Sequence, residues 1–332
     1  MERSHVPVLP AEIVEFLKPD TTNAGPVVDC TLGEGGHSAL LLEHAPDSRL
    51  IGVDADATMI ERARHFLGPR ASQVEFVCAW YDDFWLSYTG ARPHRILFDL
   101  GISTFHLAGS GRGFTFREDE PLDMRLSDSV MSAAELLSGI SQEDLADIIY
   151  VFGEERYSRR IAAAIVRVRS AGGLRTTGDL VETVTSAVPA AYRRGRINPA
   201  TRTFQALRIA VNAELERLRT ALPRALAALS PDHGRMAVIT FHSLEDRLVK
   251  WAFRAASGDE SAVGRSAVTA KHSTASKFAP KLIDTVAMPE GERITILTRR
   301  PVVPSYEEVA GNPASRSAKL RVVEKTRIEE SW

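Results

Sequence analysis

The chain has 332 residues, of which 44% are hydrophobic and 25% charged, and its formal net charge is −2. This composition is typical of an ordinary soluble protein and leaves room for a large core and a substantial second part. The amino terminus lacks a signal-peptide core and no apolar run approaches a membrane span, so we expect a cytoplasmic protein without a membrane segment.

The stretch from Val27 to Asp56 predicts a βαβ unit with a ligand in its crevice. A short apolar run ends at Asp29, and a helix is expected to begin near His37. The loop between them contains Gly33, Gly35 and Gly36. Glycines allow the backbone to approach a ligand closely, and the start of a helix directs free N–H groups at it.

A second apolar run ends at Asp54, about twenty residues after the loop, where an acid can accept both hydroxyls of a ribose. The ligand is therefore expected to contain a nucleoside, although an ordinary strand-to-helix turn is the alternative. Asp29 would repel the pyrophosphate of NAD but suits the cationic amino-acid end of S-adenosylmethionine. S-adenosylmethionine is the expected cofactor.

The following residues continue the pattern of strands with polar ends. Strands are predicted at 74–79, with Tyr81 just beyond, and at 95–100, with Asp99 near the end. Asp29, Asp54, Tyr81 and Asp99 should then share the edge where open α/β sheets bind ligands. Tyr81 is placed to lie against an adenine, or simply to pack in the core.

After residue 101 the strand-helix alternation stops. Residues 102–128 read as a long glycine-rich loop, and a helical pattern runs from 131 to about 228, broken at Gly139, Gly153, Gly172 and Gly195. A strand returns at 235–241, a mobile loop is expected at 257–281, and strands at 293–298 and 318–323 should form an edge hairpin with a turn from Asn312. We expect an α/β domain from residues 1–128 and 229–332, with 129–228 as an inserted helical subdomain.

The charge is unevenly distributed along the chain. Between Glu154 and Arg224 there are 14 arginines, no lysines and 6 acids, a net charge of +8. Such a segment favours phosphate binding and stacking on unpaired bases, although a solvated helical face with ion pairs is the plainer interpretation.

Several separate motifs, in order along the chain, resemble one known family. They are His5-Val-Pro-Val-Leu, Asp29-x-Thr-x-Gly-x-Gly-Gly-His-Ser, Asp99-Leu-Gly, Arg112-Gly-Phe-x-Phe, Pro121-Leu-Asp-Met-Arg, Gly153-Glu-Glu-Arg, Pro199-Ala-Thr-Arg-Thr-Phe-Gln-Ala-Leu-Arg, Phe241-His-Ser-Leu-Glu-Asp-Arg and Arg316-Ser-Ala-Lys-Leu-Arg. Over nearly its full length the chain resembles the bacterial 16S ribosomal RNA cytosine-N4 methyltransferases, the RsmH (MraW) family.

The resemblance implies a class I, Rossmann-like methyltransferase domain with a helical insertion. It also implies N4-methylation of a cytidine in the decoding centre, the P-site region, of 16S ribosomal RNA, within the small subunit. The family's cofactor contacts fall on Gly35, Gly36, His37, Asp54, Tyr81, Asp99 and His106. The chain departs from the family at Tyr81, where phenylalanine is common, at 103–106, where Ser-Ser-Pro-Gln is usual, and at Ala314, where an arginine is frequent.

The exocyclic amine of cytosine is a poor nucleophile, so the enzyme must accept a hydrogen bond from it and align it with the methyl group. Asp99 is the leading candidate for that acceptor, or else it only orients the cofactor. His242, directly after a buried strand, is a second catalytic candidate, though a lone histidine is more often structural. No metal is required, because the leaving group departs neutral.

A stacked cytosine cannot reach the methyl group, so the target base should be unpaired or extruded and held between apolar surfaces. Phe114 and Phe116 are candidates for that clamp, or they fasten the loop to the core. Asp123 and Arg125 are placed to read the cytosine edge, or else to pair with each other. The arginines expected to contact RNA are Arg193, Arg194, Arg196, Arg202 and Arg208.

Two other functions remain open at this level. A non-catalytic RNA-binding assembly factor would keep the fold and the arginines without using the cofactor. The second is a methyltransferase acting on protein or a small molecule, which would have no use for the arginine segment. A nucleotide-dependent oxidoreductase is disfavoured, because Asp29 before the loop has the wrong charge for its cofactor. A homodimer is also left open.

Overall fold

The computed structural model describes residues 6–18, 25–259, 278 and 288–328. Two compact units divide the chain: residues 1–103, 215–267 and 281–332 form the first, and residues 104–214 and 268–280 form the second. Most of the loop expected at 257–281 lies outside the described residues.

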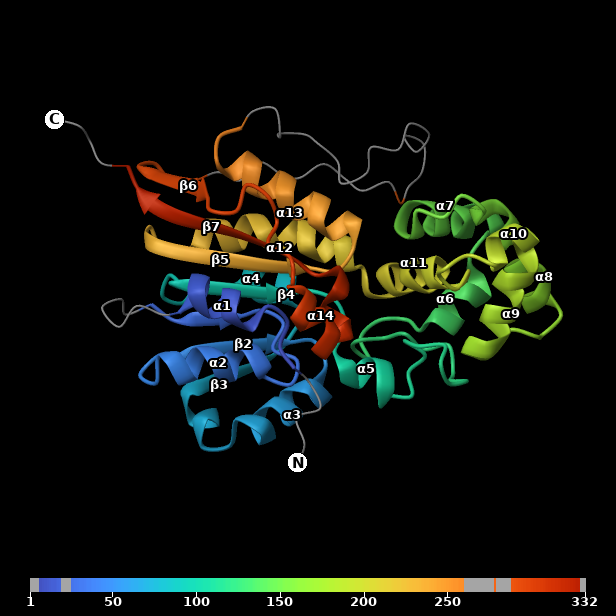
Figure 1. The fold of residues 1–332 in the computed structure, drawn as a ribbon, viewed down its shortest axis with the longest axis horizontal. Helices are drawn as coiled ribbons and strands as arrows, with labels where there is room; N and C mark the ends of the chain where they lie inside the picture. The colour runs from blue at the N-terminus through green and yellow to red at the C-terminus, as the bar shows by residue number, and fades with distance from the viewer. Residues whose placement is uncertain (1–5, 19–24, 260–277, 279–287, 329–332) are drawn as a thin grey trace. The chain divides into compact units, whose positions relative to one another are not determined.

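A seven-stranded sheet is the frame of the first unit (Figure 1). Its strands are β1 (Val27–Asp29), β2 (Leu50–Asp54), β3 (Val74–Cys78), β4 (Arg95–Asp99), β5 (Asp232–Thr240), β6 (Glu292–Ile296) and β7 (Lys319–Arg327). The strand order is β3-β2-β1-β4-β5-β7-β6. Strands β1 to β5 pair in parallel, whereas β7 runs antiparallel to both β5 and β6.

The expected pairing of the last two strands at an edge of the sheet is confirmed, with β6 as the outer strand and β7 between β6 and β5. The predicted turn between the two strands was wrong in detail. The connection between them contains helix α14 (Tyr306–Gly311) and a 3₁₀ turn (Pro313–Ser317) in place of a simple turn. Ser305 begins α14 by accepting a hydrogen bond from the Glu308 N–H, a capping signal that the sequence analysis overlooked.

Helices cover both faces of the sheet (Figure 1). Apolar side chains of α1 (Pro10–Leu17), α2 (Gly36–His44) and α3 (Ala57–Leu67) pack with one set of strand residues, including Val27, Leu50 and Leu97. α4 (Tyr81–Ser87), α12 (Glu214–Ala228) and α13 (Ser243–Ala256) pack with the other set, including Val28, Ile96 and Phe98. Neighbouring residues of a strand point to opposite faces, which explains why β2 and β4, covered on both faces, have continuous apolar runs before their terminal acids.

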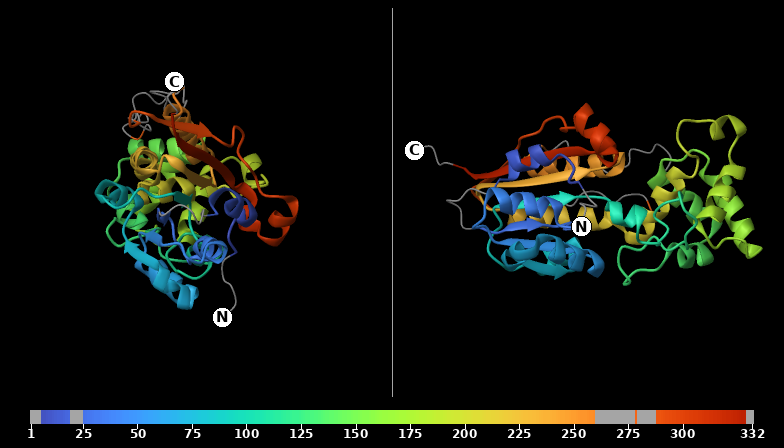
Figure 2. Two further views of the ribbon diagram at one scale, coloured as in Figure 1. Left: turned by 90° about the vertical axis from the view of Figure 1, so that its left-hand side faces the viewer. Right: turned by 60° about the horizontal axis from the view of Figure 1, so that its bottom comes forward.

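The second unit is built of helices and loops (Figure 2). Its helices are α5 (Thr104–Ala108), α6 (Ala133–Gly139), α7 (Gln142–Gly153), α8 (Ser158–Ser170), α9 (Thr177–Ala187), α10 (Ala190–Arg193) and α11 (Thr201–Asn212). The predicted breaks at Gly139 and Gly153 are the last residues of α6 and α7. α5 is a short helix in a region expected to be loop. Among the helices of the described ranges, none has both the length and the apolar composition of a membrane span.

Candidate functional site

Three carboxylates lie at one edge of the sheet in the first unit. Asp29, Asp54 and Asp99 are the last residues of β1, β2 and β4. β1 lies between β2 and β4, and all three strands are parallel, so the carboxyl ends of adjacent strands bring these acids to the same edge. This is the edge that the sequence predicted for ligand binding.

The glycine loop after β1 has the backbone conformation expected of a close approach. Gly33 and Gly35 have φ angles of 53° and 82°, values that side chains with a Cβ rarely adopt. Of the residues that the structure describes, a Cβ added at Gly33 would meet only the Thr31 carbonyl oxygen within 4 Å, at 3.9 Å, so these residues leave space open beside the loop. α2 begins at Gly36, and its first N–H groups lack helical partners.

Asp54 fastens this loop to the neighbouring strand. Its carboxylate accepts the Gly33 N–H at 2.8 Å and the Asp56 N–H at 2.9 Å. Asp56 in turn begins α3 by accepting the Thr58 N–H at 2.8 Å, as a helix-capping aspartate does. A carboxylate offers about four acceptor positions, so Asp54 can hold the loop and still accept hydroxyl groups.

Asp29 is directed into the protein. Only 1% of its surface is exposed, and its two oxygens accept hydrogen bonds from the Ser38 hydroxyl at 2.7 Å and the Thr31 N–H at 3.2 Å. Burial raises the pKa of Asp29 to about 6, and the Ser38 hydrogen bond opposes that shift without cancelling it. Its direct contact with the cofactor therefore stays a prediction, while its structural role in joining β1 to α2 is plain.

His37 bridges two parts of the site that are distant in sequence. Its Nε2 lies 2.8 Å from the Val8 carbonyl oxygen, and its Nδ1 lies 3.3 Å from Oδ2 of Asp99. Both neighbours are acceptors, so a ring protonated on both nitrogens satisfies both contacts. Burial disfavours the charged ring, but the hydrogen bond and charge of Asp99 outweigh burial and raise the pKa of His37 above its ordinary 6.5.

The carboxylate of Asp99 has one oxygen that can accept a hydrogen bond from a ligand. Its backbone N–H donates to the Thr31 hydroxyl at 2.6 Å, and Oδ2 faces His37. Oδ1 is buried and has no hydrogen-bond partner among the described residues. A buried carboxylate oxygen without a donor is costly, so this atom marks where a donor group of a ligand fits.

Two other predicted residues of the first unit have packing or capping contacts. Tyr81 is the first residue of α4, and its ring meets Phe98 edge-on, with centroids 5.6 Å apart. His242 begins α13: its Nδ1 accepts the Glu245 N–H at 3.4 Å, and its Nε2 lies 3.1 Å from Oε1 of Glu245. The sequence indicated the position of His242 but not this capping box, whose signal is an acid three residues after the cap.

The aromatic candidates of the second unit have different surroundings. Phe114 is buried and its ring lies 5.3 Å from that of His106, which is also buried. Phe116 is half-buried and meets Phe204 edge-on, with centroids 5.1 Å apart. His106 and Phe114 pack together, while Phe116 belongs to another cluster.

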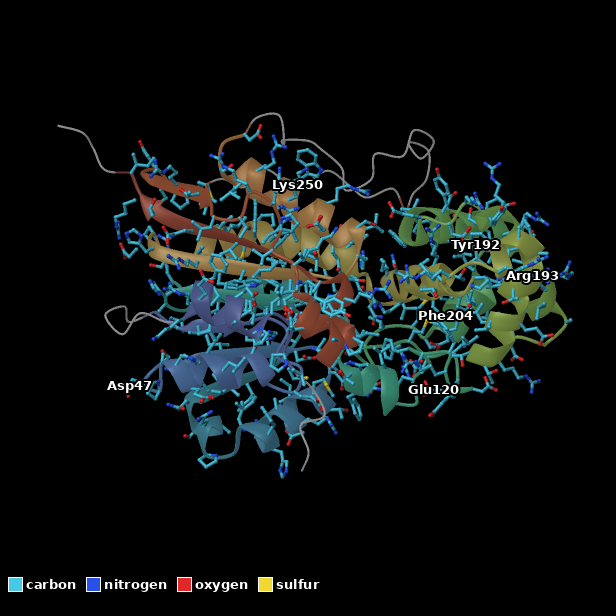
Figure 3. All side chains as sticks on the ribbon, in the orientation of Figure 1. Asp47, Glu120, Tyr192, Arg193, Phe204 and Lys250 are labelled. Carbon is cyan, nitrogen blue, oxygen red and sulfur yellow. The ribbon has the colours of Figure 1, made fainter. Side chains whose placement is uncertain are left out.

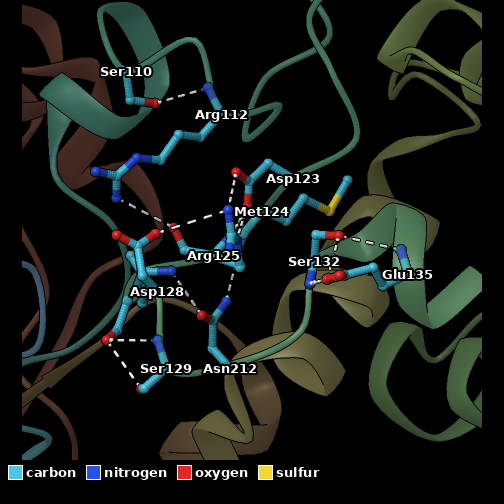
Figure 4. Close-up of polar contacts among 12 residues, drawn as sticks. Ser110, Arg112, Asp123, Met124, Arg125, Asp128, Ser129, Ser132, Glu135 and Asn212 are labelled. Carbon is cyan, nitrogen blue, oxygen red and sulfur yellow. Dashed lines mark hydrogen bonds and ion pairs between the residues drawn. The ribbon is translucent and has the colours of Figure 1, made fainter.

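Asp123 and Arg125 pair with each other, one of the two alternatives that the sequence left open. Arg125 Nε and Nη2 donate to the two carboxylate oxygens of Asp123, at 2.7 and 3.1 Å (Figure 4). Asn212, which the sequence analysis missed, fastens the same loop: its side chain accepts the Leu126 N–H at 2.9 Å and donates to the Met124 carbonyl at 2.8 Å. A single asparagine near a helix end gives little sequence signal of such a distant contact.

The five candidate arginines fall into two groups. Arg208 is bound by both oxygens of Glu214, at 2.8 and 2.9 Å, and is largely buried. The other four are exposed. Of these, Arg202 donates to the Glu154 carbonyl at 3.1 Å, and Arg193 donates to the Val188 carbonyl at 3.1 Å. Arg194 and Arg196 follow Arg193 directly in the connection to α11.

The parallel sheet with its reversed seventh strand, the glycine loop after β1 and the acid ending β2 define a class I methyltransferase fold. The profile of the MraW methylase family matches residues 2–326. With nearly the whole chain matched, the protein belongs to that family.

Relatives with known names agree with this assignment. Ribosomal RNA small subunit methyltransferase H of Treponema denticola is 45% identical over 334 residues, covering 100% of both chains. The protein of the same name from Thermotoga neapolitana is 42% identical over 96% of this chain and 95% of its own. A solved rRNA methylase from Streptococcus thermophilus has a TM-score of 0.40 and 9% identity, over 96% of this chain and 94% of that one. The assignment rests on the sequence relatives.

Proposed function

We propose that this protein transfers a methyl group from S-adenosylmethionine to N4 of a cytidine in the decoding centre of 16S ribosomal RNA. The match to the MraW methylase family over residues 2–326 carries this proposal. The named relatives, which align over 100% and 95% of their length, support a substrate in the RNA of the small ribosomal subunit. The N4 position rests on the family resemblance of the motifs.

The edge of the sheet fits S-adenosylmethionine. The chain's own residues proposed to hold it are Asp29, Gly33, Gly35, Gly36, His37, Asp54, Tyr81, Asp99 and His106. When bound, the cofactor supplies a methyl group on a positively charged sulfur. Asp54 would accept its ribose hydroxyls, the first N–H groups of α2 would face its polar end, and the open space beside Gly33 would admit it.

Asp99 is the residue to which we assign the acceptor role. Its Oδ1 has no hydrogen-bond partner in the described part of the chain, so it can accept a hydrogen bond from the cytosine amine and take the proton that the amine must lose. His37 holds Oδ2 and so fixes the direction of Oδ1. We place His242 second, because its Nδ1 is used in the cap of α13 and its Nε2, which makes no hydrogen bond among the described residues, lies 3.1 Å from a carboxylate oxygen of Glu245.

RNA recognition is assigned to the inserted helical subdomain, residues 129–228. Arg193, Arg194, Arg196 and Arg202 are exposed there and suit phosphate contacts. Arg208 is a weaker candidate, because the two charge-assisted bonds to Glu214 already occupy its guanidinium. The other proposed substrate contacts are Phe114, Phe116, Asp123 and Arg125. Phe116 is half-buried and Phe114 is buried, so Phe116 is the more accessible of the two aromatic rings.

The cellular setting follows from the substrate. A protein that modifies the small ribosomal subunit acts in the cytoplasm, so we propose that location. A homodimer stays a prediction, and light scattering of the purified protein would test it.

The direct test is incubation of the protein with S-adenosylmethionine and small ribosomal subunits that lack the modification. Digested RNA is then analysed by mass spectrometry, and N4-methylcytidine is the expected product. Asp99→Asn should lower kcat by roughly 100-fold or more, because an amide in place of the carboxylate cannot take the proton from the amine. Absence of the product with wild-type protein that still binds the cofactor would refute the proposal in favour of another acceptor or an assembly role.

A further inference from the structure

The second unit contains a pocket outside the carboxylate edge of the sheet. Its volume is about 460 Å³. It is lined by Phe116, Gly178, Val181, Glu182, Thr185, Ser186 and Arg193. Most of these residues share one side of α9, while Phe116 comes from the loop after α5 and Arg193 ends α10. The structure therefore brings together two residues, Phe116 and Arg193, that the sequence proposed separately as RNA contacts.

The two ends of the pocket have opposite charge. At the start of α9, Asp119 accepts the Gly178 N–H at 2.8 Å, so the helix terminus is already capped by a carboxylate. Hydrogen bonds from Thr176 and Gly178 lower the pKa of Asp119, which keeps that end negative. Glu182 adds a second carboxylate. A phosphate is therefore disfavoured at this end.

The opposite end is positive. The Nε and Nη2 groups of Arg193 donate to the carbonyls of Val188 and Ser186, at 3.1 and 3.3 Å. These bonds hold the guanidinium in place and use two of its five N–H donors. Arg193 lies at the surface beside Tyr192 (Figure 3), and the exposed Arg194 and Arg196 follow it. Phosphate groups are favoured here.

Phe116 supplies an aromatic surface in the lining of the pocket. Its contact with Phe204, at 5.1 Å, fixes the ring, and its half-buried state leaves part of it accessible to the pocket. Aromatic side chains stack on unpaired bases, and a pocket of several hundred cubic ångströms is the size that holds one small ligand.

We propose that this pocket binds one unpaired nucleotide of the RNA substrate, separate from the cytidine that is methylated. The base stacks on Phe116, its exocyclic amine donates to Glu182, and its phosphate lies at Arg193. This inference rests on the proposed function, because it assumes an RNA substrate. Adenine carries the required amine without being a methyl acceptor, whereas uracil lacks the amine.

The test is a fluorescence anisotropy titration of the full chain with labelled single-stranded oligoadenylate and oligouridylate of equal length. Phe116→Leu should weaken oligoadenylate binding about 5- to 150-fold, the range measured for loss of one stacked base. Ser186→Leu, which fills the pocket from an exposed helical position, should weaken binding as well without removing a core contact. Tyr306→Leu, at an 85% exposed tyrosine of the first unit, is the matched control and should bind as wild type.

Glu182→Met tests the orientation of the base. It should lower the preference for oligoadenylate over oligouridylate, and an unchanged preference would overturn the contact with Glu182. Wild-type affinity in both Phe116→Leu and Ser186→Leu would overturn the pocket itself. The proposed function fails separately, if wild-type protein transfers no methyl group to the small subunit.

Discussion

The contact of His37 with Val8 and Asp99 gives a prediction about stability and pH. Replacing His37 by Gln leaves one amide, which cannot reach both the Val8 carbonyl and the Asp99 carboxylate. One hydrogen bond to a charged group is lost, worth about 1.5 to 3 kcal/mol. Both side chains are largely buried, with 5% of His37 and 14% of Asp99 exposed, so solvent screening reduces this value little.

The pH dependence of this loss has a definite sign. The pKa of folded His37 lies above the ordinary 6.5 expected in the unfolded chain. The charged ring therefore contributes stability that is fully present below pH 6.5 and is lost as the pH rises through the folded pKa. The difference in free energy of unfolding between wild type and His37→Gln should be larger at pH 6 than at pH 9.

Urea denaturation of both proteins at pH 6 and pH 9 measures this difference directly. His44→Gln is the matched control, because His44 lies on the same helix, is exposed and contacts only the Leu40 carbonyl of its own helix in the described structure. Its effect should be within about 0.5 kcal/mol at either pH. An equal loss for His37→Gln at both pH values would refute the charged bridge and indicate a neutral ring.

Three further predictions concern separate parts of the protein. Asp54→Ala should weaken S-adenosylmethionine binding by about 1.5 to 3 kcal/mol for each ribose hydrogen bond lost, measured by calorimetry; unchanged affinity would remove Asp54 from the site. Asp29→Asn should stabilise the protein by up to about 3 kcal/mol at pH 8. Folding raises the pKa of Asp29 from 3.8 to about 6, so the ionised carboxylate destabilises the folded state increasingly between these pH values and fully above them. The gain should vanish below pH 4, and urea denaturation giving equal gains at both pH values would contradict it. Replacing Arg193, Arg194 and Arg196 together by Ala should reduce the salt slope of RNA binding by about 2, at about 0.7 per phosphate contact; an unaltered slope would remove them from the interface.

Local sequence patterns determined much of the fold and the position of the site. Apolar runs that end in Asp29, Asp54 and Asp99 identified parallel strands with acids at one edge, because burial on both faces requires continuous apolar residues. Residue type also permits the positive φ angles of Gly33 and Gly35 and favours the helix cap at Asp56.

Tertiary structure decided what each acid faces. Asp29 turns inward to Ser38, and Asp99 meets His37, which also holds Val8, 29 residues away along the chain. Asn212 fastens a loop more than eighty residues distant, and β7 enters the sheet beside β5. Local residue preferences determine the strands, helices and caps. The long-range contacts depend on which buried polar groups lie close enough to pair when the layers pack, so only the folded chain determines them.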